Sequence, residues 1–349
     1  MRLLIKPILA SAALSVGLVG LAGQTQAAEI TVVNFGGANG AAQKTAYIEP
    51  FEKMTGNKVV AVAYNSELAK LKAMVETKNV SWDVLEIEAG VIGRACEEGL
   101  LEKIDFSKIG KKADFLPEAI QECGVGTFVW STVLAYNADK LKTAPTGWAD
   151  FWNVKKFPGK RSMRKGARYN LEFALMADGV PTKDVYKVLA TKSGVERAFK
   201  KLDELKPNIQ WWEAGAQPPQ FLVAGDVVMT TAYNGRIDSA QREGKNLQVV
   251  WAGSIYDLDY WAIPKGSPNK VAAEKFIAYA SSPEAQKNYA GKIAYGPTNN
   301  NALKLLDAKT LAGLPTSAKN AKDAVGNDLK FWTDHGEDLE QRFTAWAVQ

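Results

Sequence analysis

An alternation of strand and helix patterns in the first third of the chain constrains its fold more than any other feature. Residues 29–35 read Glu-Ile-Thr-Val-Val-Asn-Phe, a β-branched run typical of a strand, and a glycine turn and a helical pattern follow it. The same order then repeats. Strands joined by single helices favour a parallel sheet, because each crossover returns the chain to the same end of the sheet. The expected elements are strands at 29–35, 58–64 and 82–87, and helices at 41–54, 67–78 and 90–99.

The carboxyl ends of these strands are the places where such a sheet binds ligands. Phe35, Gly36 and Gly37 stand at the end of the first predicted strand, and Glu88 follows the third. Glycines let a backbone approach another group closely, although a plain tight turn is the alternative interpretation. Their spacing is not the Gly-x-Gly-x-x-Gly of dinucleotide-binding turns, which argues against a dehydrogenase. We expect both strand ends to face one crevice.

Two later segments are predicted to pass between two such units. Residues 127–137 form a long apolar strand, and the chain returns near residues 261–263, at the end of the segment 254–264. Two α/β arrays joined in this way predict an α/β protein of two lobes, hinged by crossover strands, with a cleft between them. The expected lobes are residues 28–135 with 262–310, and residues 136–261 with 311–349.

A pair of carboxylates lies in the second of these segments. Asp257 and Asp259 are two residues apart among aromatics, so an extended strand points both to the same side. Like charges on one face repel, which favours a cation between them, and aromatic faces attract cations. The alternatives are a solvated edge strand with an incidental pair and, less favoured, a hydrolase that uses the two groups as acid and base.

The N-terminus has the pattern of a cleavable signal peptide. Arg2 and Lys6 precede an apolar run over residues 8–22, and small residues then lead to a predicted cleavage after Ala27. The run is too short for a comfortable membrane span. We therefore assign residues 1–27 to a signal peptide and expect the mature protein in the periplasm.

The charged and catalytic residues exclude several functions. The 43 basic and 38 acidic residues give a mild net charge of +5 and are scattered, so no nucleic-acid partner is expected. The single histidine, His335, lies near the end of the chain, which leaves a Ser-His or Cys-His nucleophile without a base. Adjacent tyrosines, as expected of a ferric-ion binder, do not occur. We expect no enzyme, no metal and no cofactor.

The only two cysteines, Cys96 and Cys123, are expected to form a disulfide, because a pair in an exported chain is most simply oxidised. The alternative is a pair of buried free thiols.

Several phrases of the chain resemble one family, the periplasmic spermidine/putrescine-binding proteins of ABC importers, over about residues 29–310. The resemblance implies a two-lobe periplasmic-binding-protein fold, each lobe a mixed sheet flanked by helices. It also implies capture of a polyamine or related small amine and its delivery to an inner-membrane ABC permease; we expect a monomer. The phrases are Ser81-Trp82-Asp83-Val84, Glu98-Gly99-Leu100-Leu101-Glu102-Lys103-Ile104-Asp105, Trp148-Ala149-Asp150-Phe151-Trp152, Tyr233-Asn234-Gly235 and Asp259-Tyr260-Trp261-Ala262-Ile263-Pro264-Lys265.

The resemblance also assigns candidate ligand-binding residues. Members of the family hold ammonium groups with acidic residues and flank the ligand with aromatics, and Asp259 matches the acid before Ala-Ile-Pro. Asp257 stands where a Trp is common, and Glu88 where a hydroxyl residue is usual. Of the pair Trp211 and Trp212, at most one can face the cleft, because neighbours on a strand point to opposite faces. The full set of candidates is Phe35, Gly36, Gly37, Glu88, Arg168, Tyr169, Trp212, Tyr233, Asp257, Asp259 and Tyr295.

One loop departs from the family pattern. The acidic pair for a second amine would fall at residues 164–169, where this chain has Arg-Lys-Gly-Ala-Arg-Tyr. Basic side chains suit a carboxylate better than a second ammonium. An alternative ligand is therefore a zwitterionic ω-amino acid such as 4-aminobutyrate, with Arg168 facing the cleft opposite Asp259. If the loop is instead solvated surface, the polyamine interpretation stands.

Overall fold

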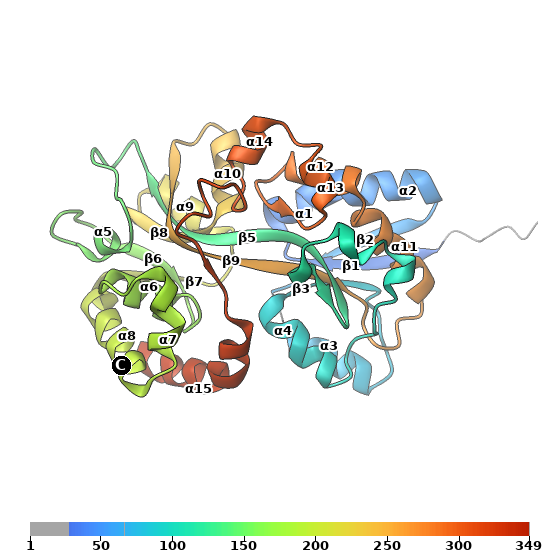
Figure 1. The fold of residues 1–349 in the computed structure, drawn as a ribbon, viewed down its shortest axis with the longest axis horizontal. Helices are drawn as coiled ribbons and strands as arrows, with labels where there is room; N and C mark the ends of the chain where they lie inside the picture. Colours follow the sequence, from blue (N-terminus) through green and yellow to red (C-terminus); the bar gives the residue numbers. More distant parts are fainter. Residues whose placement is uncertain (1–27, 66, 349) are drawn as a thin grey trace, which may run out of the picture.

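A single mixed sheet runs through both lobes of the protein. The computed structural model describes residues 28–65 and 67–348. Within them the main path of the sheet is β2-β1-β3-β9-β5-β8-β6-β7, and β4, β10 and β11 pair at its sides. Figure 1 shows helices gathered around the two ends of this sheet, with β5 and β9 spanning the middle. The predicted α/β two-lobe fold is confirmed.

The strands are β1 (Glu29–Asn34), β2 (Lys58–Ala63), β3 (Val84–Glu88), β4 (Ile120–Gln121), β5 (Gly124–Asn137), β6 (Arg161–Arg164), β7 (Ile209–Trp212), β8 (Met229–Tyr233), β9 (Leu247–Ala262), β10 (Gly296–Pro297) and β11 (Val325–Gly326). The α-helices are α1 (Gly37–Gln43), α2 (Glu49–Thr55), α3 (Leu68–Glu76), α4 (Ala89–Glu97), α5 (Trp148–Trp152), α6 (Asn170–Ala177), α7 (Val185–Leu189), α8 (Lys192–Leu205), α9 (Gln217–Ala224), α10 (Asn234–Arg242), α11 (Lys270–Ala280), α12 (Pro283–Ala290), α13 (Asn300–Leu303), α14 (Ala308–Ala312) and α15 (Leu329–Ala347).

The first three long strands form the predicted parallel unit. β1 lies between β2 and β3 and is parallel to both, with Val32 opposite Val84. Val32 and Val84 are fully buried, because helices cover this part of the sheet on its faces. The turn after β1 is shorter than expected. The helix begins at Gly37 rather than near residue 41, and a π-helical turn at Lys44–Ile48 joins α1 to α2.

Strands β5 and β9 connect the lobes as an antiparallel pair. Every residue of β5 is buried, as expected of a strand covered on both faces. Its first half also pairs with β10 and its second half with β8, so its partners change between Val129 and Thr132. β9 changes partners in the same region, because β3 pairs with residues 259–262 and β11 with Ile255 and Tyr256. The lobe boundaries given above remain a prediction.

The C-terminal helix also reaches across the molecule. α15 packs against α4, and the two meet along the lower edge of the view in Figure 1. No helix within the described residues is long and apolar enough to cross a membrane. The predicted signal peptide, residues 1–27, lies outside the described residues.

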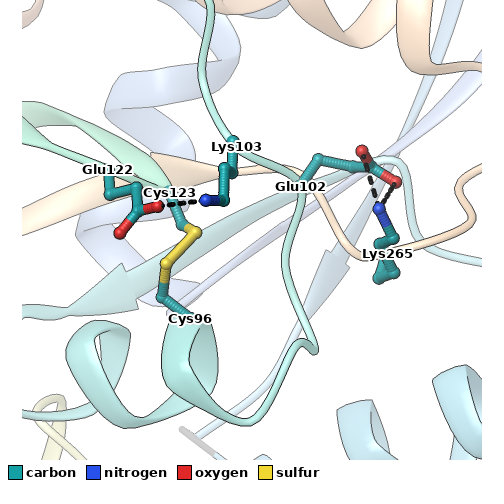
Figure 2. Close-up of a disulfide and its surroundings, with 6 residues drawn as sticks. All are labelled: Cys96, Glu102, Lys103, Glu122, Cys123 and Lys265. Atoms are coloured by element: carbon teal, nitrogen blue, oxygen red, sulfur yellow. Dashed lines mark hydrogen bonds and ion pairs between the residues drawn. A yellow bond between two sulfur atoms is a disulfide. The ribbon is translucent and has the colours of Figure 1, made fainter.

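A disulfide fastens α4 to the start of β5. Cys96 and Cys123 are bonded, with their Cα atoms 5.8 Å apart, as predicted. Figure 2 shows the bridge beside an ion pair of Lys103 and Glu122, whose charged atoms lie 2.6 Å apart. A second pair in the same view joins Glu102 to Lys265, with its atoms 3.3 Å apart. The bridge therefore fixes α4, which follows directly after Glu88.

We predict that replacing both Cys96 and Cys123 by Ala lowers the free energy of unfolding by roughly 3 kcal/mol, because the loop that the bridge closes becomes free in the unfolded chain. Urea denaturation measures this difference. Thiol titration of the denatured, unreduced parent should find no free thiol, and two reactive thiols would contradict the bridge.

Candidate functional site

A small cavity lies where β5 and β9 cross between the lobes. Its volume is about 70 Å³, far below the ~300–1,000 Å³ typical of sites for drug-sized ligands. Both lobes contribute side chains, and acids, bases and aromatics are all present. The lining residues are Phe35, Asn39, Asn65, Glu88, Phe128, Trp130, Arg164, Glu213, Gly215, Tyr233, Arg236, Asp259 and Tyr295.

The acidic side of the cavity is set by strand register. β3 and β9 are antiparallel, and Glu88 is directly opposite Asp259. Asp259 is 4% exposed, and its Oδ1 accepts a hydrogen bond of 2.8 Å from Trp130 Nε1 on β5. Burial raises the pKa of Asp259 well above its usual range, and the carboxylates of Glu86 and Glu88 raise it further. An added positive charge would relieve this repulsion.

Two arginines form the basic side of the cavity. Arg164 is the last residue of β6, and its Nη2 lies 3.7 Å from Glu88 Oε1, so its charge is already partly balanced. Arg236 is buried on α10, where Nη1 and Nη2 donate to the carbonyl oxygens of Gly36 and Phe35 at 3.0 and 3.3 Å. Among the described residues no carboxylate pairs with Arg236, and its Nε has no hydrogen-bond partner. Arg236 can therefore accept an anionic group.

The two glycines at the end of β1 leave room for the Arg236 guanidinium. Gly36 and Gly37 have φ angles of 57° and 55°, a left-handed backbone that favours glycine. A Cβ on Gly37 would lie 2.5 Å from Arg236 Nη1. The sequence predicted that this backbone approaches another group closely. That group is the Arg236 guanidinium, which belongs to the other lobe.

Aromatic rings form the remaining walls. Phe35 lies 5.0 Å from Tyr64 in a stacked pair, and Tyr295 lies 4.8 Å from Phe128 in another, measured between ring centroids. Trp130 meets Tyr233 edge to face at 4.8 Å. The structure brings the predicted residues Phe35, Tyr233 and Tyr295 to one cavity, where aromatic faces can cover a methylene chain or a cation.

Asp257 and Tyr169 lie near the cavity without lining it. Asp257 Oδ2 accepts hydrogen bonds from Tyr169 Oη at 3.1 Å and from Asn327 Nδ2 at 2.6 Å, and its Oδ1 accepts from the Leu258 amide. Burial raises the pKa of Asp257 to about 6. The carboxylate therefore joins the Tyr169 loop to the segment before α15, and it does not form an acid–base pair with Asp259 at the cavity.

Arg168 and Trp212 also lie away from the cavity. The Arg168 guanidinium stacks 5.2 Å from the centroid of Trp332 on α15, and this arginine does not line the cavity. Trp212 is fully buried behind Tyr233 and donates from Nε1 to Thr231. Of the two arginines of the predicted loop, the structure brings Arg164 and not Arg168 to this cavity, because β6 extends to residue 164 and its end reaches the cavity.

Sequence reasoning missed Trp130 and Arg236 as site residues. Trp130 lies in a segment that had been recognised as a crossover strand, and a polar-tipped aromatic there was a usable signal. Arg236 follows Tyr233-Asn234-Gly235 directly, but an arginine in the first turn of a helix carries no signal of what it faces. Glu213 and Asn65 lie on loops at the edge of the cavity, and only the three-dimensional structure places them there.

The cavity has the chemistry of a binding site for a small charged molecule. Carboxylates, guanidiniums and aromatic rings all line it. Within the part of the chain that the structure describes, no group of three or more His, Cys, Asp or Glu side chains could hold a metal ion. The arrangement can neutralise a cation and an anion at the same time.

Comparison with known proteins places the chain in a family. Residues 46–322 match the bacterial extracellular solute-binding proteins. The chain belongs to this family. The chain is also similar to the group that its sequence resembles. The spermidine/putrescine-binding periplasmic protein of Salmonella typhimurium is 28% identical over 271 residues, which cover 74% of this chain and 75% of that protein.

Two other relatives are more similar. The γ-aminobutyric acid-binding protein of Pseudomonas aeruginosa is 58% identical over 328 residues, which cover 94% of this chain and 93% of that protein. The solved structure of a GABA receptor is 36% identical with a TM-score of 0.81, over 91% of this chain and 97% of the other. The TM-score shows that the solved structure has the same fold as this chain.

The contact of Arg168 with α4 gives a test of how the lobes meet. A Cβ on Gly90 would lie 1.6 Å from Arg168 Nη1, whereas a Cβ on Gly93 of the same helix would meet nothing within 4 Å. We predict that Gly93→Ala raises the free energy of unfolding by up to about 1 kcal/mol through helix propensity. Gly90→Ala should lose this gain, because Arg168 must leave Trp332. Equal gains in urea denaturation would show that Arg168 does not occupy this position in solution.

Proposed function

We propose that this protein is a periplasmic substrate-binding protein of an ABC importer and that its ligand is a zwitterionic ω-amino acid such as 4-aminobutyrate. One observation supports the choice of ligand above all: a buried guanidinium without a carboxylate partner shares a small cavity with a buried carboxyl group. These groups are Arg236 and Asp259.

Asp259 is the proposed partner of the ligand's ammonium group. It is the most deeply buried acid that lines the cavity, and the Trp130 indole fixes its orientation from β5. Its other neighbours on β3 are acidic, so a cation is attracted to this side of the cavity. Trp130 and Tyr233 add ring faces and edges that exclude water from the ion pair.

Arg236 is the proposed partner of the carboxylate. Arg164 also lines the cavity, but Glu88 already balances its charge. Arg236 has a free Nε, and its guanidinium is held by backbone carbonyl oxygens, which leave its positive charge uncompensated. A planar fork presented in this way suits a carboxylate.

The charges of the cavity also disfavour a diamine. Two guanidiniums, of Arg164 and Arg236, line the cavity together with the buried Asp259. A second ammonium would have to lie beside one of these arginines without screening by water. The polyamine interpretation, our first from the sequence, is thus less well supported than the amino-acid alternative, and the 58% identity to a γ-aminobutyric acid-binding protein agrees with this order.

Transport follows from the proposed class of protein. The predicted signal peptide would export the chain to the periplasm, where the lobes close on the ligand as a hinged clamp and deliver it to an inner-membrane permease. No cofactor takes part, and the protein acts as a monomer.

The role of Arg236 is testable by calorimetry with 4-aminobutyrate and putrescine, which are similar in length and differ at one end. We predict that the parent prefers 4-aminobutyrate, and that Arg236→Gln weakens its binding more than tenfold because a buried charge loses its partner. Binding of putrescine should not weaken, since the lost guanidinium repels it.

Arg242→Gln is the matched control, because Arg242 lies on the same helix with a half-exposed side chain that pairs with Asp238 at 2.8 Å. This control should bind as the parent does. Arg236→Lys keeps the positive charge and tests whether that charge alone is sufficient for binding 4-aminobutyrate. It also guards against an effect in Arg236→Gln that comes only from loss of the backbone contacts. A parent that prefers putrescine, or an Arg236→Gln variant with unchanged affinity for 4-aminobutyrate, would overturn the proposal.

A further inference from the structure

Glu86 is a fully buried carboxyl group that does not line the cavity and lies on the strand that pairs with the Asp259 strand. It lies on β3, two residues before Glu88 and on the same side of the strand. The register of β3 with β9 sets Glu86 opposite Trp261 and Glu88 opposite Asp259. The side chains of Glu86 and Asp259 therefore lie on the same face of the two paired strands, and each carboxyl group shifts the pKa of the other.

The hydrogen bonds of Glu86 indicate which of these two buried carboxyl groups retains a proton. Asn39 Nδ2 donates to both oxygens of Glu86 at 2.8 and 3.1 Å, and Gln43 Nε2 donates at 2.7 Å. Tyr289 Oη donates to Asn39 Oδ1, so Asn39 must present its amino group to Glu86. Three hydrogen bonds from two amide groups favour an ionised Glu86. A proton retained by this pair of carboxyl groups therefore resides on Asp259.

We propose that Glu86 is a positioning residue for ammonium capture: it holds Asp259 through a shared proton in the empty cavity, and a cationic amine replaces that proton on binding. The inference deepens the proposed function, because it requires that the cavity takes an ammonium group. The exchange is balanced. The O–H bond of Asp259 breaks, the proton passes to water, and an N–H of the ammonium donates to the carboxylate in its place.

The charges around Asp259 favour replacement of its proton by a cation and not by a neutral molecule. An uncharged amine would leave the proton in place, whereas an ammonium restores the charge that the proton supplied. The titratable or charged groups that face the pair are Tyr47 on the π-helical turn, Glu88 on β3, Arg164 on β6, Tyr233 on β8, Arg236 on α10, Tyr260 on β9, Tyr289 on α12 and Tyr295. Burial raises the pKa of both Glu86 and Asp259, which is the direction that retains a proton in the empty cavity.

The sign of the pH dependence follows from this exchange. A group protonated in the empty protein and ionised in the complex makes binding stronger as pH rises, and the dependence ends above the pKa of the empty pair. Release of one proton for each ligand corresponds to about a tenfold loss of affinity for each pH unit of acidification.

The test is calorimetry of 4-aminobutyrate in buffers that differ in ionisation enthalpy, between about pH 5 and about pH 8. The parent should release protons, up to about one for each ligand at the acidic end. Glu86→Gln should abolish the release and flatten the pH profile, because an amide N–H can hold Asp259 in its ionised form. Glu274→Gln is the control: Glu274 is buried in the same lobe, pairs with Lys108 at 2.8 Å, and should leave the release unchanged.

The outcomes separate this inference from the proposed function. If 4-aminobutyrate does not bind at any pH, the proposed function fails. If it binds the parent without release of protons across the range, the function stands and the role of Glu86 is refuted, whether or not Glu86→Gln folds. A release that Glu86→Gln and Glu274→Gln both retain would also refute it.

Discussion

The antiparallel pairing of β5 with β9 is the contact on which the rest of the structure depends. Pairing extends from Val125 with Trp261 to Asn137 with Leu247, and the register shifts twice. This ladder carries Trp130 and Asp259 into the space between the lobes, where they hydrogen-bond to each other. The two strands that run through both lobes therefore also contribute side chains to the cavity.

The cavity balances burial against charge. A carboxyl group as deeply buried as Asp259 is costly to ionise without a partner. The structure offers it an indole N–H and a second carboxyl group, Glu86, but no cation within hydrogen-bonding distance among the described residues. Arg236 has the opposite deficiency, with a positive charge that only carbonyl oxygens contact. A zwitterion satisfies both groups at once, which neither a diamine nor a dicarboxylate can do.

The fold class and the first strands could be predicted from the sequence, because β-branched runs such as residues 29–35 report local structure directly. Phe35, Asp259 and Tyr295 were also within reach, since each ends or lies in a recognisable strand or turn. The arginines were not. Arg164 was assigned to a loop because nothing local marks the end of β6, and Arg168 is held by Trp332, which lies far along the chain. Which basic group faces a cavity depends on long-range packing, and a single sequence does not encode that in any local pattern.

The central claim is that two fixed, opposite charges recognise the two ends of one small ligand. The most direct measurement is the affinity of an ω-amino acid series from glycine to 6-aminohexanoate, together with butylamine and butyrate. Because Asp259 and Arg236 are held by the sheet and by backbone carbonyls, affinity should peak at one chain length and fall at least about tenfold for one methylene more or less. Both singly charged compounds should bind more weakly than the matching amino acid. An affinity that rises steadily with length, or butylamine that binds as tightly as 4-aminobutyrate, would contradict the account.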